Sequence, residues 1–171
     1  MRQYRATFLY IDNIIKSDLK TMIAALISFG HFLAFFAMSA ALVVQLVLLS
    51  ETMNLEHARR VRRASLVYGL SIITIFIFGS LRVFYFEKGA EYYFNNIFFI
   101  TKLAIFFLIA ILHLIPTIRF ISWGNALSQN NVPRLSDSET RLLRLVIHAE
   151  LTGIGIILLC AALMAHGIGE I

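Results

Sequence analysis

The stretch ITKLAIFFLIAILHLIPTIR, residues 100–119, decides the fold class of this chain. It is apolar along almost its whole length, and a helix needs about 20 such residues to cross roughly 30 Å of hydrocarbon. It nevertheless carries Lys102 and His113 inside the apolar run, and Pro116 near its end. Ionisable groups at membrane depth usually face a protein interior. The stretch therefore predicts a membrane helix that turns one polar face toward other helices.

The composition of the whole chain supports this interpretation. Hydrophobic residues make up 59% of the 171 residues and charged residues 15%, whereas soluble domains have about 25% charged residues. Four segments approach or exceed the length of a membrane helix, at about 22–49, 64–81, 96–121 and 145–165. We predict an all-α integral membrane protein, in which residues 21–171 form an up-and-down bundle of four transmembrane helices.

Residues 1–20 precede the first apolar segment. Tyr4, Phe8, Ile11 and Ile15 follow helical spacing, which indicates a short amphipathic segment that lies in the membrane interface. A plain helical extension of the first span is the alternative.

The distribution of Lys and Arg gives an expected orientation. The loops predicted at 51–63 and 123–144 are rich in Arg, and together with Arg119 they outweigh the basic residues of the opposite side. The positive-inside rule then puts both termini outside the cytoplasm. The basic N-terminal segment favours the reverse orientation.

Each predicted span carries polar residues that share a face. Lys102 and His113 differ by only about 20° around the third span, and His148 and His166 lie at the same azimuth of the fourth. Depth divides the polar residues into two layers. The layer nearer the termini contains His31, Arg82, Lys102 and His166, and the other contains Gln45, His113, His148 and Glu150. We expect these side chains to converge on a shared interior.

Such an interior suits three kinds of chemistry. A heme needs an imidazole as axial ligand and cations, here Arg82 or Lys102, near its propionates. A copper or zinc ion needs two or more histidines around one point, with His31, His113 and His148 as candidates. A proton relay would use Glu150 with His113 or His148. Lys102 and Glu150 are the candidate catalytic residues. A purely structural or interaction protein, whose stripes only specify packing, is a further alternative.

Three short motifs carry a resemblance to a known family. They are FGHFLAF (29–35), GSLRVFYFEKG (79–89) and IPTIRFISW (115–123). With these motifs, residues 22–169 resemble a family of predicted four-helix bacterial membrane proteins of unknown function, which implies the bacterial inner membrane as location.

More remotely, the layout is similar to HemJ-type protoporphyrinogen oxidases and CopD copper-resistance membrane proteins. In the HemJ type, a histidine of the first helix is implicated in heme b binding, and a lysine sits early in the third. The matching residues here are His31 and Lys102. The resemblance implies a heme b protein, an oxidoreductase, with His31 as the metal ligand. The CopD likeness implies metal handling or transport without porphyrin.

The expected partners follow from the same features. They are membrane lipid, a small hydrophobic or porphyrin substrate, and a second copy of the chain packed through glycine-containing faces. No motif for nucleic acid is present in the sequence, so we expect no nucleic-acid partner.

Overall fold

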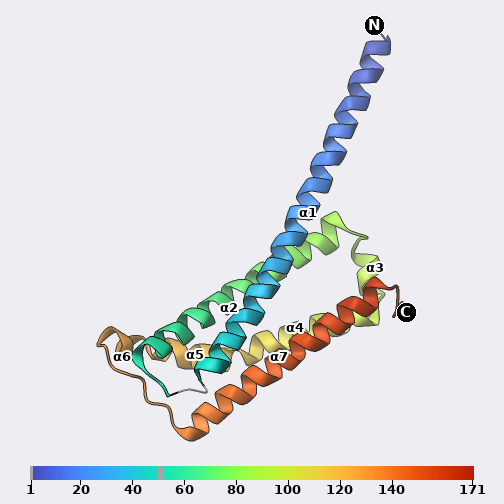
Figure 1. The fold of residues 1–171 in the computed structure, drawn as a ribbon. Coiled ribbons are helices and arrows are strands. Elements are labelled where there is room, and N and C mark those ends of the chain that lie inside the picture. The colour runs from blue at the N-terminus through green and yellow to red at the C-terminus, as the bar shows by residue number, and fades with distance from the viewer. Residues whose placement is uncertain (1, 50–51) are drawn as a thin grey trace.

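The structure, a computed structural model, describes residues 2–49 and 52–171, with the backbone alone for residues 2–11 and 13. Its elements run in the order α1, α2, η1, α3, α4, α5, α6 and α7 (Figure 1). Four stretches are long and apolar enough to cross a membrane: Ile14–Leu48, Leu55–Phe86, Ile97–Ser128 and Asp137–Ala165. The prediction of an all-α, four-helix membrane bundle is confirmed.

Helix α1, Arg2–Leu48, is one continuous helix. Its N-terminal part projects beyond the other helices, in line with the first span (Figure 1). The side chains of Tyr4, Phe8 and Ile11 lie outside the described residues, so the prediction of an amphipathic interfacial segment over 1–20 stays a prediction.

Helix α2, Leu55–Leu81, begins earlier than the sequence suggested. The arginine-rich stretch 51–63 was predicted as a loop, but from Leu55 onward it is helical. The side chain of Asn54 caps the helix, since its Oδ1 accepts a 2.8 Å hydrogen bond from the His57 backbone N–H. Ala58 and Val61 are fully buried in the same turns, so packing on the core extends the helix through the basic residues.

A π-helical turn, η1 (Arg82–Phe86), ends this span, and the short helix α3 (Ala90–Phe94) leads to the next. Gly89 separates the two turns at φ +89°, a conformation that other residues rarely adopt. The C-terminal tail lies beside this corner, because the Ile97 N–H donates to the Gly169 carbonyl and the Ile171 N–H to the Asn95 carbonyl, both at 2.9 Å.

The third span is divided into α4 (Ile97–Leu112), α5 (Leu114–Ser122) and the short α6 (Gly124–Ser128). The break between α4 and α5 falls at His113. Pro116 explains this position, since it has no N–H to continue the helical hydrogen bonds and is tolerated in a first turn.

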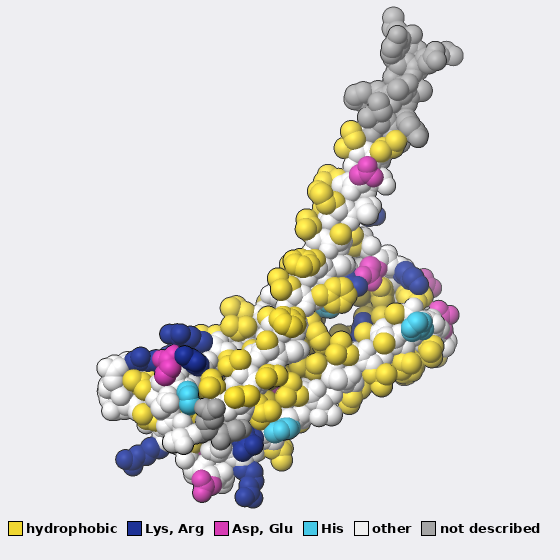
Figure 2. All heavy atoms as spheres, viewed as in Figure 1, with side chains coloured by type: hydrophobic (Ala, Val, Ile, Leu, Met, Phe, Trp, Pro, Cys, Tyr) yellow, Lys and Arg dark blue, Asp and Glu magenta, His cyan; other side chains and the backbone are white. Residues whose placement is uncertain are grey.

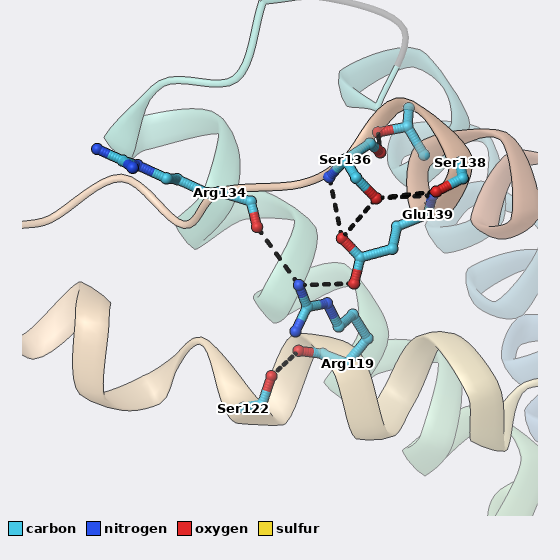
Figure 3. A network of polar contacts seen from close by, with 7 residues as sticks. Arg119, Ser122, Arg134, Ser136, Ser138 and Glu139 are labelled. Carbon is cyan, nitrogen blue, oxygen red and sulfur yellow. Dashed lines mark hydrogen bonds and ion pairs between the residues drawn. The ribbon is translucent and has the colours of Figure 1, made fainter.

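The fourth span, α7 (Asp137–Ala165), begins with a capping box. The cap is Ser136, because Glu139 lies three residues after it and accepts a hydrogen bond from its backbone N–H at 2.9 Å. Glu139 also binds Arg119 Nη2 at 2.9 Å, and Arg119 Nη2 donates to the Arg134 carbonyl (Figure 3). This network ties α5 to the start of α7.

The four spans pack as two pairs. Helix α1 contacts α2 along most of its bundled length, and α4 contacts α7 in the same way. Glycines permit the close approach within each pair: a Cβ on Gly30 would lie 2.2 Å from the Phe78 ring, and one on Gly153 would lie 2.7 Å from Ile109 Cγ2.

The pairs meet at one end of the bundle and separate at the other. At the end that carries α5 and α6, α5 contacts both α2 and α7, and Phe120 and Trp123 are buried there. We call this the packed end. At the end that carries η1, α3 and both chain termini, a hollow remains between the pairs (Figure 2). We call this the cavity end.

The outer surface is that of a membrane protein. Hydrophobic side chains cover the flanks of the helices, and many Lys and Arg side chains gather at the packed end (Figure 2). Apolar flanks between charged ends are the pattern that a bilayer requires.

Candidate functional site

The cavity end contains a cavity of about 650 Å³ between the two helix pairs. This volume lies within the range of about 300–1,000 Å³ that is usual for small-molecule sites. Its walls are mostly aromatic and aliphatic, with Phe76, Phe99, Phe106 and Phe107 among them. The polar exceptions include His31, Arg82, Glu87 and Lys102, three of which were predicted as site residues.

His31 projects from α1 toward α2 and lines the cavity. Gly79 of α2 makes room for its ring, since a Cβ there would lie 3.2 Å from His31 Cε1 and 3.6 Å from Nδ1. Nδ1 is buried and has no hydrogen-bond partner among the described residues. A buried imidazole nitrogen without a partner is an uncommon and costly arrangement. Its Nδ1–Cε1 edge faces Gly79.

Arg82 is held by an acidic partner at the rim of the cavity. Its Nε and Nη2 lie 2.6 and 2.5 Å from Glu87 Oε1, and the Tyr93 hydroxyl donates to Glu87 Oε2. The guanidinium also lies over the Phe32 ring of α1, 5.3 Å from its centroid. This pairing of Arg82 with Glu87 fixes the guanidinium in place.

Lys102 lines the cavity and, like Lys88, has no carboxylate partner among the described residues. Its Nζ lies over the Phe99 ring at 4.9 Å, and it makes no hydrogen bond or ion pair with any described residue. The side chain is half-buried on α4. An ammonium in these surroundings favours an anionic group brought by a ligand.

A second polar site lies toward the packed end. His113 and Glu150 are 3% and 0% exposed, and His113 Nδ1 lies 3.2 and 3.1 Å from Glu150 Oε1 and Oε2. The Tyr68 ring stacks on the imidazole with a centroid distance of 3.5 Å and an interplanar angle of 24°.

His148 and His166 belong to neither site. Both are exposed, and His148 Nδ1 donates to the Arg144 carbonyl of its own helix at 2.7 Å. Helix α7 turns its other face inward, with Val146, Ile147, Glu150 and Gly153 buried. The azimuth shared by His148 and His166 was correctly counted, but it marks the outer face of the helix.

The predicted shared interior is therefore replaced by two separate sites. The structure brings His31, Arg82 and Lys102 together at the cavity, and it pairs His113 with Glu150 elsewhere. In the described part of the chain, no three His, Cys, Asp or Glu side chains gather as a metal site would require. The sequence analysis missed Tyr68, Tyr93 and the role of Gly79, since nothing in the spacing of one helix reveals which residue of another lies opposite.

Residues 23–169 match the family described as Predicted membrane protein (DUF2214), and the chain belongs to this family. The match confirms the resemblance to a family of predicted membrane proteins. No curated protein and no solved structure matches the chain. The similarity to HemJ-type and CopD proteins stays a prediction.

Proposed function

We propose that this membrane protein binds heme b in the cavity, with His31 as axial ligand. The observation that carries the proposal is the imidazole of His31, which lines an aromatic cavity and has no hydrogen-bond partner at its buried nitrogen. Heme b, when bound, supplies reversible one-electron chemistry, which a HemJ-like oxidoreductase would use. The protein residues supply the ligand, the apolar walls and the positive charge.

The charges around the cavity suit an anionic ligand. Arg82, Lys88 and Lys102 line it together with the single acidic residue Glu87, so the ionisable lining is positive overall. Glu87 pairs with Arg82, and Lys88 is exposed with its Nζ over the Tyr92 ring. The half-buried Lys102 is therefore the cation that we assign to a propionate. This refines the sequence prediction, in which Arg82 and Lys102 had equivalent roles.

The aromatic lining suits a flat, largely apolar ring. Phe76 and Phe107 come from α2 and α4 and meet edge to face at 5.9 Å. Ligand sites of this kind combine predominantly hydrophobic walls with a few placed polar groups. A small hydrophobic or porphyrin substrate would use the same surface.

Absorption spectroscopy tests this proposal. The chain, purified in mild detergent after expression with a heme precursor, is expected to show a Soret band that shifts on reduction. His31→Gln should abolish the band or shift it strongly, because the axial ligand is lost. His148→Gln is the matched control, since this histidine is exposed on the outer face of α7, and it should leave the band unchanged.

Two results would overturn the proposal. A band that His31→Gln leaves unchanged would show that His31 is not the ligand. A colourless wild-type protein that takes up no added hemin would exclude heme b. In that case, copper or zinc in the purified protein would favour metal handling of the CopD type, and a protein free of both metal and heme would favour a structural or interaction role.

A further inference from the structure

The packed end holds two ionisable side chains that heme binding at the cavity does not use. His113 and Glu150 come from different spans and meet in the interior, 3% and 0% exposed. Both carboxylate oxygens lie within hydrogen-bond distance of His113 Nδ1, at 3.2 and 3.1 Å. Both oxygens of the Glu150 carboxyl group therefore contact the same imidazole nitrogen.

The surrounding residues fix this pair in position. His113 lies at the break between α4 and α5, and the Tyr68 ring covers one face of its imidazole at a centroid distance of 3.5 Å. His113 Nε2 and the Tyr68 hydroxyl are both buried without a hydrogen-bond partner among the described residues. Tyr68 is a positioning residue, because it touches the imidazole by its ring and makes no hydrogen bond to the carboxyl group.

The number of protons on the pair decides its net charge. A neutral imidazole beside a carboxylate would leave one negative charge in the membrane interior. One added proton makes the pair neutral, either as imidazole with carboxylic acid or as imidazolium with carboxylate. A buried charge without a partner is strongly unfavourable, so the folded protein favours the state with the added proton.

No other charged side chain among the described residues compensates for this carboxylate. The described part of α1 that packs in the bundle has only His31 as an ionisable residue, and His31 lies in the cavity. Helix α2 contributes the neutral hydroxyl of Tyr68. Arg119 of α5 pairs with Glu139. The other candidates face away: Lys102 of α4 lines the cavity, and Arg144 and His148 of α7 are exposed.

From this geometry we propose that His113 and Glu150 form a proton-binding site that holds one exchangeable proton between two membrane spans. The proton comes from water and adds either to Nδ1 of the imidazole or to a carboxylate oxygen. The site is separate from the cavity and independent of whether the cavity binds heme.

Thermal unfolding of the full chain in detergent, followed from mildly acidic to mildly alkaline pH, tests the proposal. The unfolded chain releases the histidine proton near pH 6.5, whereas the folded pair keeps its added proton. Stability depends on pH through this difference in bound protons. The wild-type midpoint should therefore fall as the pH rises above the ordinary histidine range.

Two variants should change this pH dependence. One should reverse its direction, and the other should move its onset to a lower pH. In Glu150→Gln the buried partner is neutral, so folded His113 carries no added proton, and the midpoint should instead fall as the pH decreases through the histidine range. In His113→Gln the isolated Glu150 must stay protonated to remain buried. Its midpoint should begin to fall at a lower pH than in the wild type.

His148→Gln is the matched control, because it removes an exposed histidine of α7 and keeps both members of the pair, and it should retain the wild-type slope. Identical pH slopes in the wild type and Glu150→Gln would overturn the proposal. Should Glu150→Gln fail to fold, His113→Gln decides the matter, since a slope equal to that of the wild type would also overturn it.

Discussion

The histidines at the cavity end and at the packed end of this bundle have different surroundings. At the packed end, His113 meets the carboxylate of Glu150 and lies under the Tyr68 ring. At the cavity end, His31 meets a glycine and an open space, and Lys102 has no acidic partner. The same residue type thus has a partner within the protein at one end and faces a cavity at the other.

The difference follows from how the helix pairs meet. At the packed end, α5 bridges α2 and α7, so polar side chains of separate spans come within contact distance. At the cavity end, η1 and α3 lead the chain from one pair to the other and leave the space between them. The ionisable residues of that end face this space.

The largest expected contrast between the two ends is in stability. Phe120→Ala removes a side chain that is fully buried at the packed end, and such truncations destabilise by about 3–5 kcal/mol. Phe107→Ala removes a cavity-lining side chain that is 44% exposed, and we expect less than half of that loss. Denaturant unfolding in detergent measures both. Equal losses would show that the cavity end is packed as tightly as the other.

A smaller effect is expected where α4 and α7 approach closely. Gly153→Ala places a Cβ 2.7 Å from Ile109 Cγ2, and overpacking of this kind destabilises by about 1–3 kcal/mol. Gly155→Ala is the matched control on the same helix, because nothing lies within 4 Å of its Cβ position. A thermal melt in which both variants match the wild type would contradict the close packing of this pair.

Lys102 at the cavity end gives a prediction on binding. Lys102→Gln should weaken hemin affinity about ten- to hundredfold, since hydrogen bonds to charged groups contribute about 1.5–3 kcal/mol. Lys88→Gln removes a cation that lies 4.1 Å from the centroid of the Tyr92 ring, and it should change the affinity less. Titration followed at the Soret band compares them. If Lys88→Gln has the larger effect, the propionate partner has been misassigned.

The smallest effect is expected at the loop that closes the packed end. Ser136→Ala removes the cap of α7, and loss of such a cap destabilises by about 1 kcal/mol. Ser138→Ala, two residues further on, removes a hydroxyl that bonds only to the Ser136 hydroxyl among the described residues. Thermal midpoints should separate the two variants, and a Ser138→Ala loss as large as that of Ser136→Ala would contradict the assigned cap.

The sequence was sufficient for the features that depend on one helix at a time. The lengths of the apolar segments predicted the four spans. Pro116 explains the break in the third span. The start of α2 was misplaced because its arginines look like a loop, although Asn54 caps it and Ala58 packs into the core.

The sites depend on pairs of helices, and the sequence was less informative there. Helical periodicity places Lys102 and His113 on one face, but it does not say that one lines a cavity and the other meets Glu150. The stripe of His148 was assigned inward because polar residues in lipid are costly. In the structure the nearly opposite face of α7, which carries the buried Glu150, turns inward instead. Which face turns inward depends on the partner helix.

Double-mutant cycles on unfolding free energy test most directly whether the two polar sites are separate. The effects of His31→Gln and Glu150→Gln should add to within about 0.5 kcal/mol, as for sites that share no partners. His113→Gln and Glu150→Gln should instead show a coupling of about 1 kcal/mol or more, because they remove the two halves of one contact. Coupling between His31 and Glu150 as strong as that between His113 and Glu150 would mean that the membrane interior contains one shared site.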